Sequence, residues 1–253
     1  MKSEVLYEKR DDIAITTLNN PEKLNPMSDM VREGLLEALN EAQRDDEVRA
    51  VILTGSGKAF SAGADLVGFG HFLDDSARSK AYFKEAIQFM HKVEIFPKPL
   101  IAAVNGYAFG GGFELALTCD MIIASQNAVF SSIEAKLGLI PAYGMVRLPQ
   151  IVGRSKAKEI MMTSDTLSAE EAHRINLVSK VVPSEKLMDE SICLAKKIAQ
   201  HESAAIELIK SVINRDLGEG ELAYTGLGIS SLFETEIVKK SIREFLQKTN
   251  TKV

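Results

Sequence analysis

The sequence is poor in the residues that mark several classes of protein. It has no tryptophan and two cysteines, Cys119 and Cys193, among 253 residues. Two cysteines form neither a disulfide framework nor the ligand spacing of a zinc site, so we expect no bound metal. Both lie in apolar or amphipathic stretches, and we expect both thiols to be buried.

Basic residues are not in excess, and long hydrophobic runs are missing. Lysine and arginine number 30 against 35 aspartates and glutamates, giving a net charge of −5 at pH 7. This balance indicates no surface for nucleic acid. No apolar run approaches the ~20 residues of a membrane span, and the first residues are charged rather than a signal segment. We therefore expect a cytoplasmic protein without a membrane partner, with an organellar form that has lost a transit peptide as the alternative.

The most informative segment is residues 99–117. Residues 100–104 are apolar and bounded by proline and Asn-Gly, which predicts a buried strand. Three glycines at 110–112 follow, and then residues with helix-forming composition that include Glu114. Glycines at such a junction let a ligand approach the backbone, and the first N–H groups of a helix suit a developing negative charge. A carboxylate beside them outlines an acid–base active site.

Glycines at such junctions also serve close packing alone, and a glutamate in a first helical turn is often merely solvated. A second junction favours the active-site interpretation. Residues 50–54 predict another buried strand, which runs into a loop of small residues at 55–66. Ala64 in this loop offers an N–H with almost no side chain in the way. Two such N–H groups aimed at one oxygen form an oxyanion hole.

A third element places a second carboxylate. Residues 128–133 predict a short strand, and Glu134 follows it, before a turn rich in glycine and proline at 138–141. Alone, Glu134 is more often a loop carboxylate than a catalytic residue.

Together these segments resemble the enoyl-CoA hydratase/isomerase (crotonase) superfamily. The residues that carry the resemblance are Ser61-Ala62-Gly63-Ala64-Asp65-Leu66, the stretch from Asn105 to Asp120 with its Gly-Gly-Gly-Phe-Glu-Leu core, Ile133-Glu134, and Leu137-Gly138-Leu139-Ile140-Pro141. Flanking segments at 18–25, 169–183 and 233–248 extend the resemblance over nearly the whole chain.

The resemblance implies roles for particular residues. The N–H groups of Ala64 and Gly111 would bind the thioester carbonyl of an acyl-CoA, and Glu114 and Glu134 match the two carboxylates of the hydratases. Glu134 would exchange the proton of Cα, and Glu114 would hold the water and help to deprotonate it. The substrate-binding residues would be Lys23, Ala62, Asp65, Leu66, Gly110, Tyr143, Phe233 and Lys248. Coenzyme A would enter as part of the substrate, with no other cofactor.

Some positions depart from the family pattern. Tyr143 and Met145 stand where a glycine-rich turn is common, so they could reshape the acyl pocket. Val67 occupies a position where some members place a lysine for a CoA phosphate. Asn176 replaces a frequent glycine, a mild change because asparagine tolerates left-handed backbone.

The order of elements predicts an α/β fold, which in the family is a spiral of repeated ββα units with a C-terminal helical region. Ser28 is expected to cap a helix that ends at Arg44. We divide the chain into residues 1–195, a core with the acyl-CoA site, and residues 196–253, a helical region for oligomerisation and site closure. The family implies a homotrimer or a hexamer.

Hydration of a 2-enoyl-CoA is the favoured reaction, because isomerases of the family generally work with one carboxylate. A Δ3,Δ2-enoyl-CoA isomerase, or a hydratase or dehydratase of a branched or cyclic acyl-CoA, is the alternative. A non-catalytic acyl-CoA-binding protein is the alternative from another class. The sequence leaves the acyl length and the direction of the reaction open.

Overall fold

The computed structural model describes residues 3–69 and 75–214. Its larger sheet has the strand order β1-β2-β3-β5-β7-β10, in which β1 pairs antiparallel with β2 and the other pairs are parallel. The smaller sheet has the order β4-β6-β8-β9. The strands are β1 (Val5–Arg10), β2 (Ile13–Leu18), β3 (Ala50–Gly55), β4 (Ala59–Ser61), β5 (Leu100–Val104), β6 (Tyr107–Phe109), β7 (Met121–Ser125), β8 (Val129–Ser131), β9 (Leu167–Ser168) and β10 (Lys180–Val182).

Three strand pairs repeat one plan. In β3–β4, β5–β6 and β7–β8 the first strand joins the larger sheet and the second joins the smaller sheet. The second strands β4, β6 and β8 pair in parallel, as the first strands do. This arrangement confirms the predicted α/β fold of repeated ββα units.

Helices follow these strand pairs. The α-helices are α1 (Asp29–Arg44), α2 (Leu66–Phe69), α3 (Ser76–Glu94), α4 (Gly111–Leu117), α5 (Gly144–Val152), α6 (Arg154–Thr163), α7 (Ala169–Arg174), α8 (Leu187–Ala199) and α9 (Ser203–Ile213). Short 3-10 turns are η1 (Pro21–Lys23), η3 (Glu134–Leu137) and η4 (Ser184–Lys186). The predicted cap of α1 is confirmed, because the Ser28 hydroxyl accepts a hydrogen bond from the Val31 N–H at 3.2 Å.

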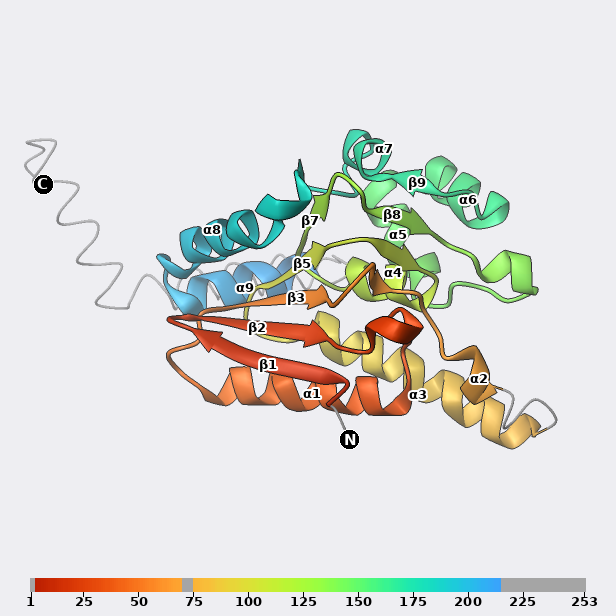
Figure 1. Cartoon of the computed structure of the whole chain (residues 1–253), viewed down its shortest axis with the longest axis horizontal. Coiled ribbons are helices and arrows are strands. Elements are labelled where there is room, and N and C mark those ends of the chain that lie inside the picture. Colours follow the sequence, from red (N-terminus) through yellow and green to blue (C-terminus); the bar gives the residue numbers. More distant parts are fainter. Residues whose placement is uncertain (1–2, 70–74, 215–253) are drawn as a thin grey trace, which may run out of the picture. The chain divides into compact units, whose positions relative to one another are not determined.

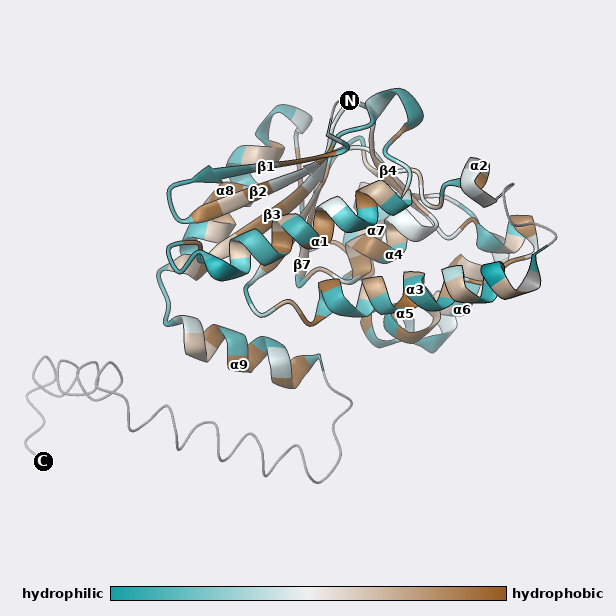
Figure 2. Ribbon diagram, turned by 90° about the horizontal axis from the view of Figure 1, so that it is seen from below, coloured by the Kyte–Doolittle hydropathy of each residue, from teal (hydrophilic) through white to brown (hydrophobic). Residues whose placement is uncertain are grey.

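The larger sheet is covered on both faces, α1 and α3 lying on one side and α8 on the other (Figure 1). In β3, Val51 and Leu53 belong to the core on the α1 side, whereas Ala50 and Ile52 belong to the core against α8. Side chains alternate between the faces of a strand, so a strand buried on both faces is apolar throughout. Helix α1 carries hydrophilic residues on its outer face, and the strands behind it are largely hydrophobic (Figure 2).

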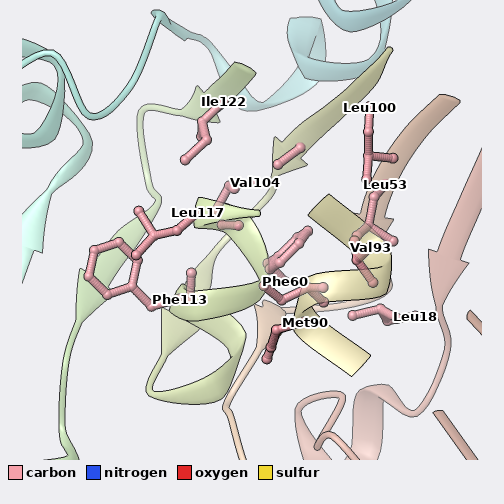
Figure 3. Close-up of a cluster of buried hydrophobic side chains, with 14 of the residues drawn as sticks. Leu18, Leu53, Phe60, Met90, Val93, Leu100, Val104, Phe113, Leu117 and Ile122 are labelled. Carbon is pink, nitrogen blue, oxygen red and sulfur yellow. The ribbon is translucent and has the colours of Figure 1, made fainter. Parts of the chain in front are cut away.

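The core on the α1 side also fixes helix α4. Phe113 and Leu117 on α4 point into the same cluster as Phe60 on β4 and Met90 on α3 (Figure 3). Phe113 and Phe60 are almost completely buried. Burial of a side chain of this size contributes roughly 1.5–3 kcal/mol. Helix α4 is therefore anchored by its apolar face, and Glu114, its one polar side chain, points elsewhere.

The expectation of two buried thiols is wrong for Cys193. Helix α8 buries Leu187, Ser191 and Ala195, which are four residues apart on one face. Cys193 lies between these positions on the other side of the helix and is exposed, while Cys119 is half-buried.

The described residues form a first compact unit that ends at Gln200 and a second that begins at His201. Helix α9 is the described element of the second unit. The predicted tail helices, with Phe233 and Lys248, lie outside the described residues. Within the described ranges, no helix has both the length and the hydropathy required to cross a membrane.

One buried amide ties the connection before α1 to the loop between β3 and β4. Asn25 is fully buried and has a positive φ of 55°. Its Nδ2 donates hydrogen bonds to the carbonyls of Ser56 at 2.9 Å and Ala59 at 2.8 Å, and its Oδ1 accepts one from the Asn20 N–H at 2.8 Å. These bonds hold two segments that approach the same end of the sheet.

We predict that Asn25→Ala lowers the free energy of unfolding by about 2–4 kcal/mol, because buried carbonyls lose their donor and alanine is strained at this φ. Urea unfolding measures the change. Asn40→Ala, at an exposed position of α1, is the matched control and should be close to neutral. Equal effects in the two variants would contradict this account of the loop.

Candidate active site

A cavity of about 390 Å³ opens between α1, α3, α4, the turn η3 and the residues just before α5. Most of its walls are apolar side chains, among them Phe83, Phe89 and Met90 of α3. Polar atoms reach it from two backbone segments and from Glu114 and Glu134. An apolar cavity with a few convergent polar groups is the usual form of a small-molecule site.

Ala64 and Gly111 bring two backbone N–H groups to one corner of this cavity. A methyl group placed on the Gly111 α-carbon would lie 3.7 Å from the Ala64 nitrogen. Gly111 is the first residue of α4, so its N–H has no partner inside the helix. Within residues 3–69 and 75–214, neither N–H donates a hydrogen bond. The pair is therefore available to a ligand oxygen.

The loop that carries Ala64 is held by its neighbours. The buried Ser61 hydroxyl donates to the Asn25 carbonyl at 2.7 Å and accepts from the Gly63 N–H at 3.2 Å. The Gly63 carbonyl in turn accepts a hydrogen bond from the Met27 N–H at 2.8 Å. Gly63 has a φ of +96°, and an added Cβ would lie 2.5 Å from the Phe109 carbonyl oxygen. Only glycine fits there.

Glu114 projects from the first turn of α4 toward the start of α5. Its Oε1 accepts hydrogen bonds from the backbone N–H groups of Tyr143 and Gly144, both at 2.7 Å. Burial raises the pKa of Glu114 to about 7, the Glu134 charge adds to the rise, and the two N–H groups oppose it. The carboxyl group is thus held in place and can exchange a proton near neutral pH.

Glu134 begins η3, which follows the carboxyl end of β8, and it reaches the same cavity. Its Oε2 accepts a hydrogen bond from the Ser132 hydroxyl at 2.8 Å. A Cβ added to Gly110 would lie 3.2 Å from Oε1, so glycine leaves room for this carboxylate. Burial raises the pKa of Glu134, as it does for Glu114. Two half-buried carboxyl groups that interact should titrate as a coupled pair.

The structure brings together most of the residues singled out from the sequence. The cavity is lined by Ala62, Ala64, Leu66, Gly110, Gly111, Glu114, Glu134 and Tyr143. Lys23, in the exposed turn η1, and Asp65 are absent from its walls. Met145 is also absent from the walls and is exposed, because α5 turns it outward. Phe233 and Lys248 lie outside the described residues.

Some residues at the site escaped the sequence analysis. Arg32 of α1 lines the cavity, with its guanidinium carbon 4.4 Å from the centre of the Tyr82 ring. Glu94 at the end of α3 and Arg147 of α5 form an ion pair behind Tyr143. None of these three residues belongs to a sequence motif of the family segments named above. Each acquires its place at the site from a contact between segments that are distant in the chain.

A family model described as enoyl-CoA hydratase/isomerase matches residues 8–252. The chain belongs to this family. It is 40% identical over 250 residues to a probable mitochondrial enoyl-CoA hydratase of Dictyostelium discoideum, covering 95% of this chain and 87% of the relative. It is 36% identical over 251 residues to a short-chain-enoyl-CoA hydratase of Clostridium acetobutylicum, covering 97% and 95%. The crystal structure of an enoyl-CoA hydratase from Bacillus anthracis is similar with a TM-score of 0.89 and 32% identity, covering 97% and 96%.

The raised pKa of Glu114 predicts a pH-dependent cost in stability. In the unfolded chain the Glu114 carboxyl group ionises as the pH rises past 4.5, its ordinary pKa. In the folded protein it keeps its proton up to about pH 7, because its pKa is raised to about 7. Rising pH therefore favours the unfolded state between these values. Glu114→Gln removes this cost and should raise the free energy of unfolding by up to about 3 kcal/mol at pH 8, with little change at pH 4.

Urea titrations of both proteins at pH 4 and pH 8 measure the difference. Glu33→Gln, at an exposed position of α1, is the control and should show no such pH-dependent gain. A Glu114→Gln effect of the same size at both pH values would contradict the raised pKa.

Proposed function

We propose that this protein is an enoyl-CoA hydratase, which adds water reversibly across the 2,3 double bond of a 2-enoyl-CoA. The observation that carries the proposal is the convergence on one apolar cavity of Glu114, Glu134 and two N–H groups that have no acceptor among the described residues. The relatives named as enoyl-CoA hydratases support the same reaction.

The thioester carbonyl would accept hydrogen bonds from the N–H groups of Ala64 and Gly111. These bonds stabilise the negative charge that develops on the oxygen when a nucleophile adds to Cβ. Removing one such donor from an oxyanion hole typically slows catalysis about 100- to 1000-fold. The donors are backbone groups held by packing, so they need little reorganisation as the charge forms.

The two glutamates divide the proton transfers. Glu114 holds the water and takes its proton as the oxygen bonds to Cβ, and Glu134 delivers a proton to Cα. Transfer of a proton from Glu114 back to Glu134 then restores the starting state of both carboxyl groups. A scaffold that only bound acyl-CoA would have no use for two buried carboxylates, which cost stability. The same groups serve dehydration in reverse.

The acyl chain would lie against the apolar walls from α3 and from residues 137–142. Coenzyme A is bound as part of the substrate. The family origin of the chain supports a homotrimer or a hexamer in which residues 196–253 take part in oligomerisation and in closing the site, with Phe233 and Lys248 as residues for the CoA portion, together with Lys23 and Asp65.

We predict that the protein hydrates crotonyl-CoA, and that Glu114→Gln and Glu134→Gln each lower kcat by roughly 100- to 10,000-fold, the usual contribution of a general acid or base. Loss of the enoyl-thioester absorbance measures the rate, and circular dichroism checks the fold. Glu33→Gln is the matched control and should keep full activity.

Other results of the crotonyl-CoA assay would favour a different function. A loss in one glutamate variant alone would favour an isomerase that works with one carboxylate. Binding of acyl-CoA without turnover of crotonyl-CoA or of branched and cyclic enoyl-CoAs would favour a non-catalytic binding protein. Failure to bind any acyl-CoA would overturn the proposal.

A further inference from the structure

Behind Glu114 lies a buried ionic cluster that the proposed reaction does not use directly. Glu94, the last residue of α3, is only 4% exposed. Its carboxylate pairs with the guanidinium of Arg147 on α5, at 2.5 Å to Nε and 2.6 Å to Nη2. Nη2 donates a hydrogen bond to Oε2, and Nε lies close to Oε1, so both carboxylate oxygens are next to the positive charge.

Tyr143 connects this cluster to Glu114. Its phenol hydroxyl donates a hydrogen bond to Glu94 Oε2, and burial raises the pKa of the phenol, which keeps the donor protonated. At the other end of the residue, the backbone N–H of Tyr143 donates to Glu114 Oε1 at 2.7 Å. The ring between them forms part of the cavity wall. Tyr143 is therefore held at both ends.

The connection joins three elements of the site through polar contacts. Glu94 comes from α3, Arg147 from α5, Tyr143 from the position just before α5, and Glu114 from α4. An ion pair of low exposure leaves its partners few alternative arrangements, because an unpaired buried charge is strongly disfavoured. The cluster thus restricts where the first N–H groups of α5 can lie.

We infer that Tyr143 is a positioning residue for Glu114, and that Glu94 and Arg147 hold Tyr143 in the orientation that aims its N–H at the catalytic carboxylate. The inference rests on the proposed hydratase function for its kinetic consequences. Tyr143 would thus align the carboxyl group of Glu114, in addition to forming part of the cavity wall.

Tyr143→Phe tests the inference, since it removes one hydroxyl and keeps the ring and the backbone N–H. We expect kcat on crotonyl-CoA to fall about tenfold, because small displacements of a catalytic group reduce rates steeply, while KM stays within about twofold. The acyl-length preference should not change. Glu94→Gln, which keeps an acceptor for the phenol and loses the charge, should lower kcat in the same way.

Tyr7→Phe is the matched control. The Tyr7 hydroxyl, on β1, is buried and has no hydrogen-bond partner among the described residues. Its removal should leave kcat and KM unchanged. A merely structural role of the Tyr143 hydroxyl would lower the melting temperature and leave kcat at the control value, and that result would overturn the inference.

A second measurement does not depend on turnover. Titration of the Glu114 carboxyl carbon by NMR, assigned through Glu114→Gln, should give a higher pKa in Tyr143→Phe than in the unsubstituted protein, because looser N–H donors stabilise the carboxylate less. The charged or titratable groups that line the cavity with Glu114 are Arg32 of α1, Tyr82 of α3, Glu134 of η3 and Tyr143, and of these the charge of Glu134 acts on the pKa of Glu114. Glu94 of α3 and Arg147 of α5 lie behind Tyr143. An unchanged titration would overturn the inference. If the unsubstituted protein hydrates no enoyl-CoA but the titration shifts, the hydratase proposal fails and the positioning role stands.

Discussion

The close approach of two backbone segments is the constraint on which the site depends. A Cβ on Gly112 would lie 2.3 Å from the Ser61 carbonyl oxygen, and one on Gly63 would lie 2.5 Å from that of Phe109. Side chains at either position would push the loop after β4 away from the start of α4. Without this approach, the N–H groups of Ala64 and Gly111 could not serve one oxygen. The ββα repeats set strands β4 and β6 side by side and so make the approach possible.

The desolvation of two carboxyl groups at the proposed active site lowers the stability of the protein. Glu114 and Glu134 are removed from water, which disfavours their ionised forms and raises the pKa of each. The surroundings offset part of this cost with the two N–H groups of α5 and the Ser132 hydroxyl. Phe113 and Leu117 anchor α4 in the hydrophobic core. Their burial stabilises the helix and so offsets the cost of removing Glu114 from water.

Much of this architecture could be predicted because its signals are local. The apolar strand at 100–104, the serine cap of α1 and the glycines at the start of α4 each depend on neighbouring residues, and the structure confirms them. Asn176, expected to tolerate left-handed backbone, has a φ of 63°. The cluster of Glu94, Tyr143 and Arg147 has no local signal, because it forms between segments about fifty residues apart in the chain. The exposure of Cys193 was missed because an apolar residue type was taken to be buried, although the spacing of Leu187, Ser191 and Ala195 places Cys193 on the opposite face of α8.

The proposed reaction adds water to the double bond of the acyl group, whereas an isomerase would only move that bond. Turnover of crotonyl-CoA in water enriched with oxygen-18, followed by mass spectrometry of the hydroxyacyl product, tests it most directly. We predict a 3-hydroxyacyl-CoA that carries one solvent-derived oxygen-18 at Cβ, with incorporation lost in Glu114→Gln. Products that retain the mass of the substrate, with the double bond displaced, would contradict the account.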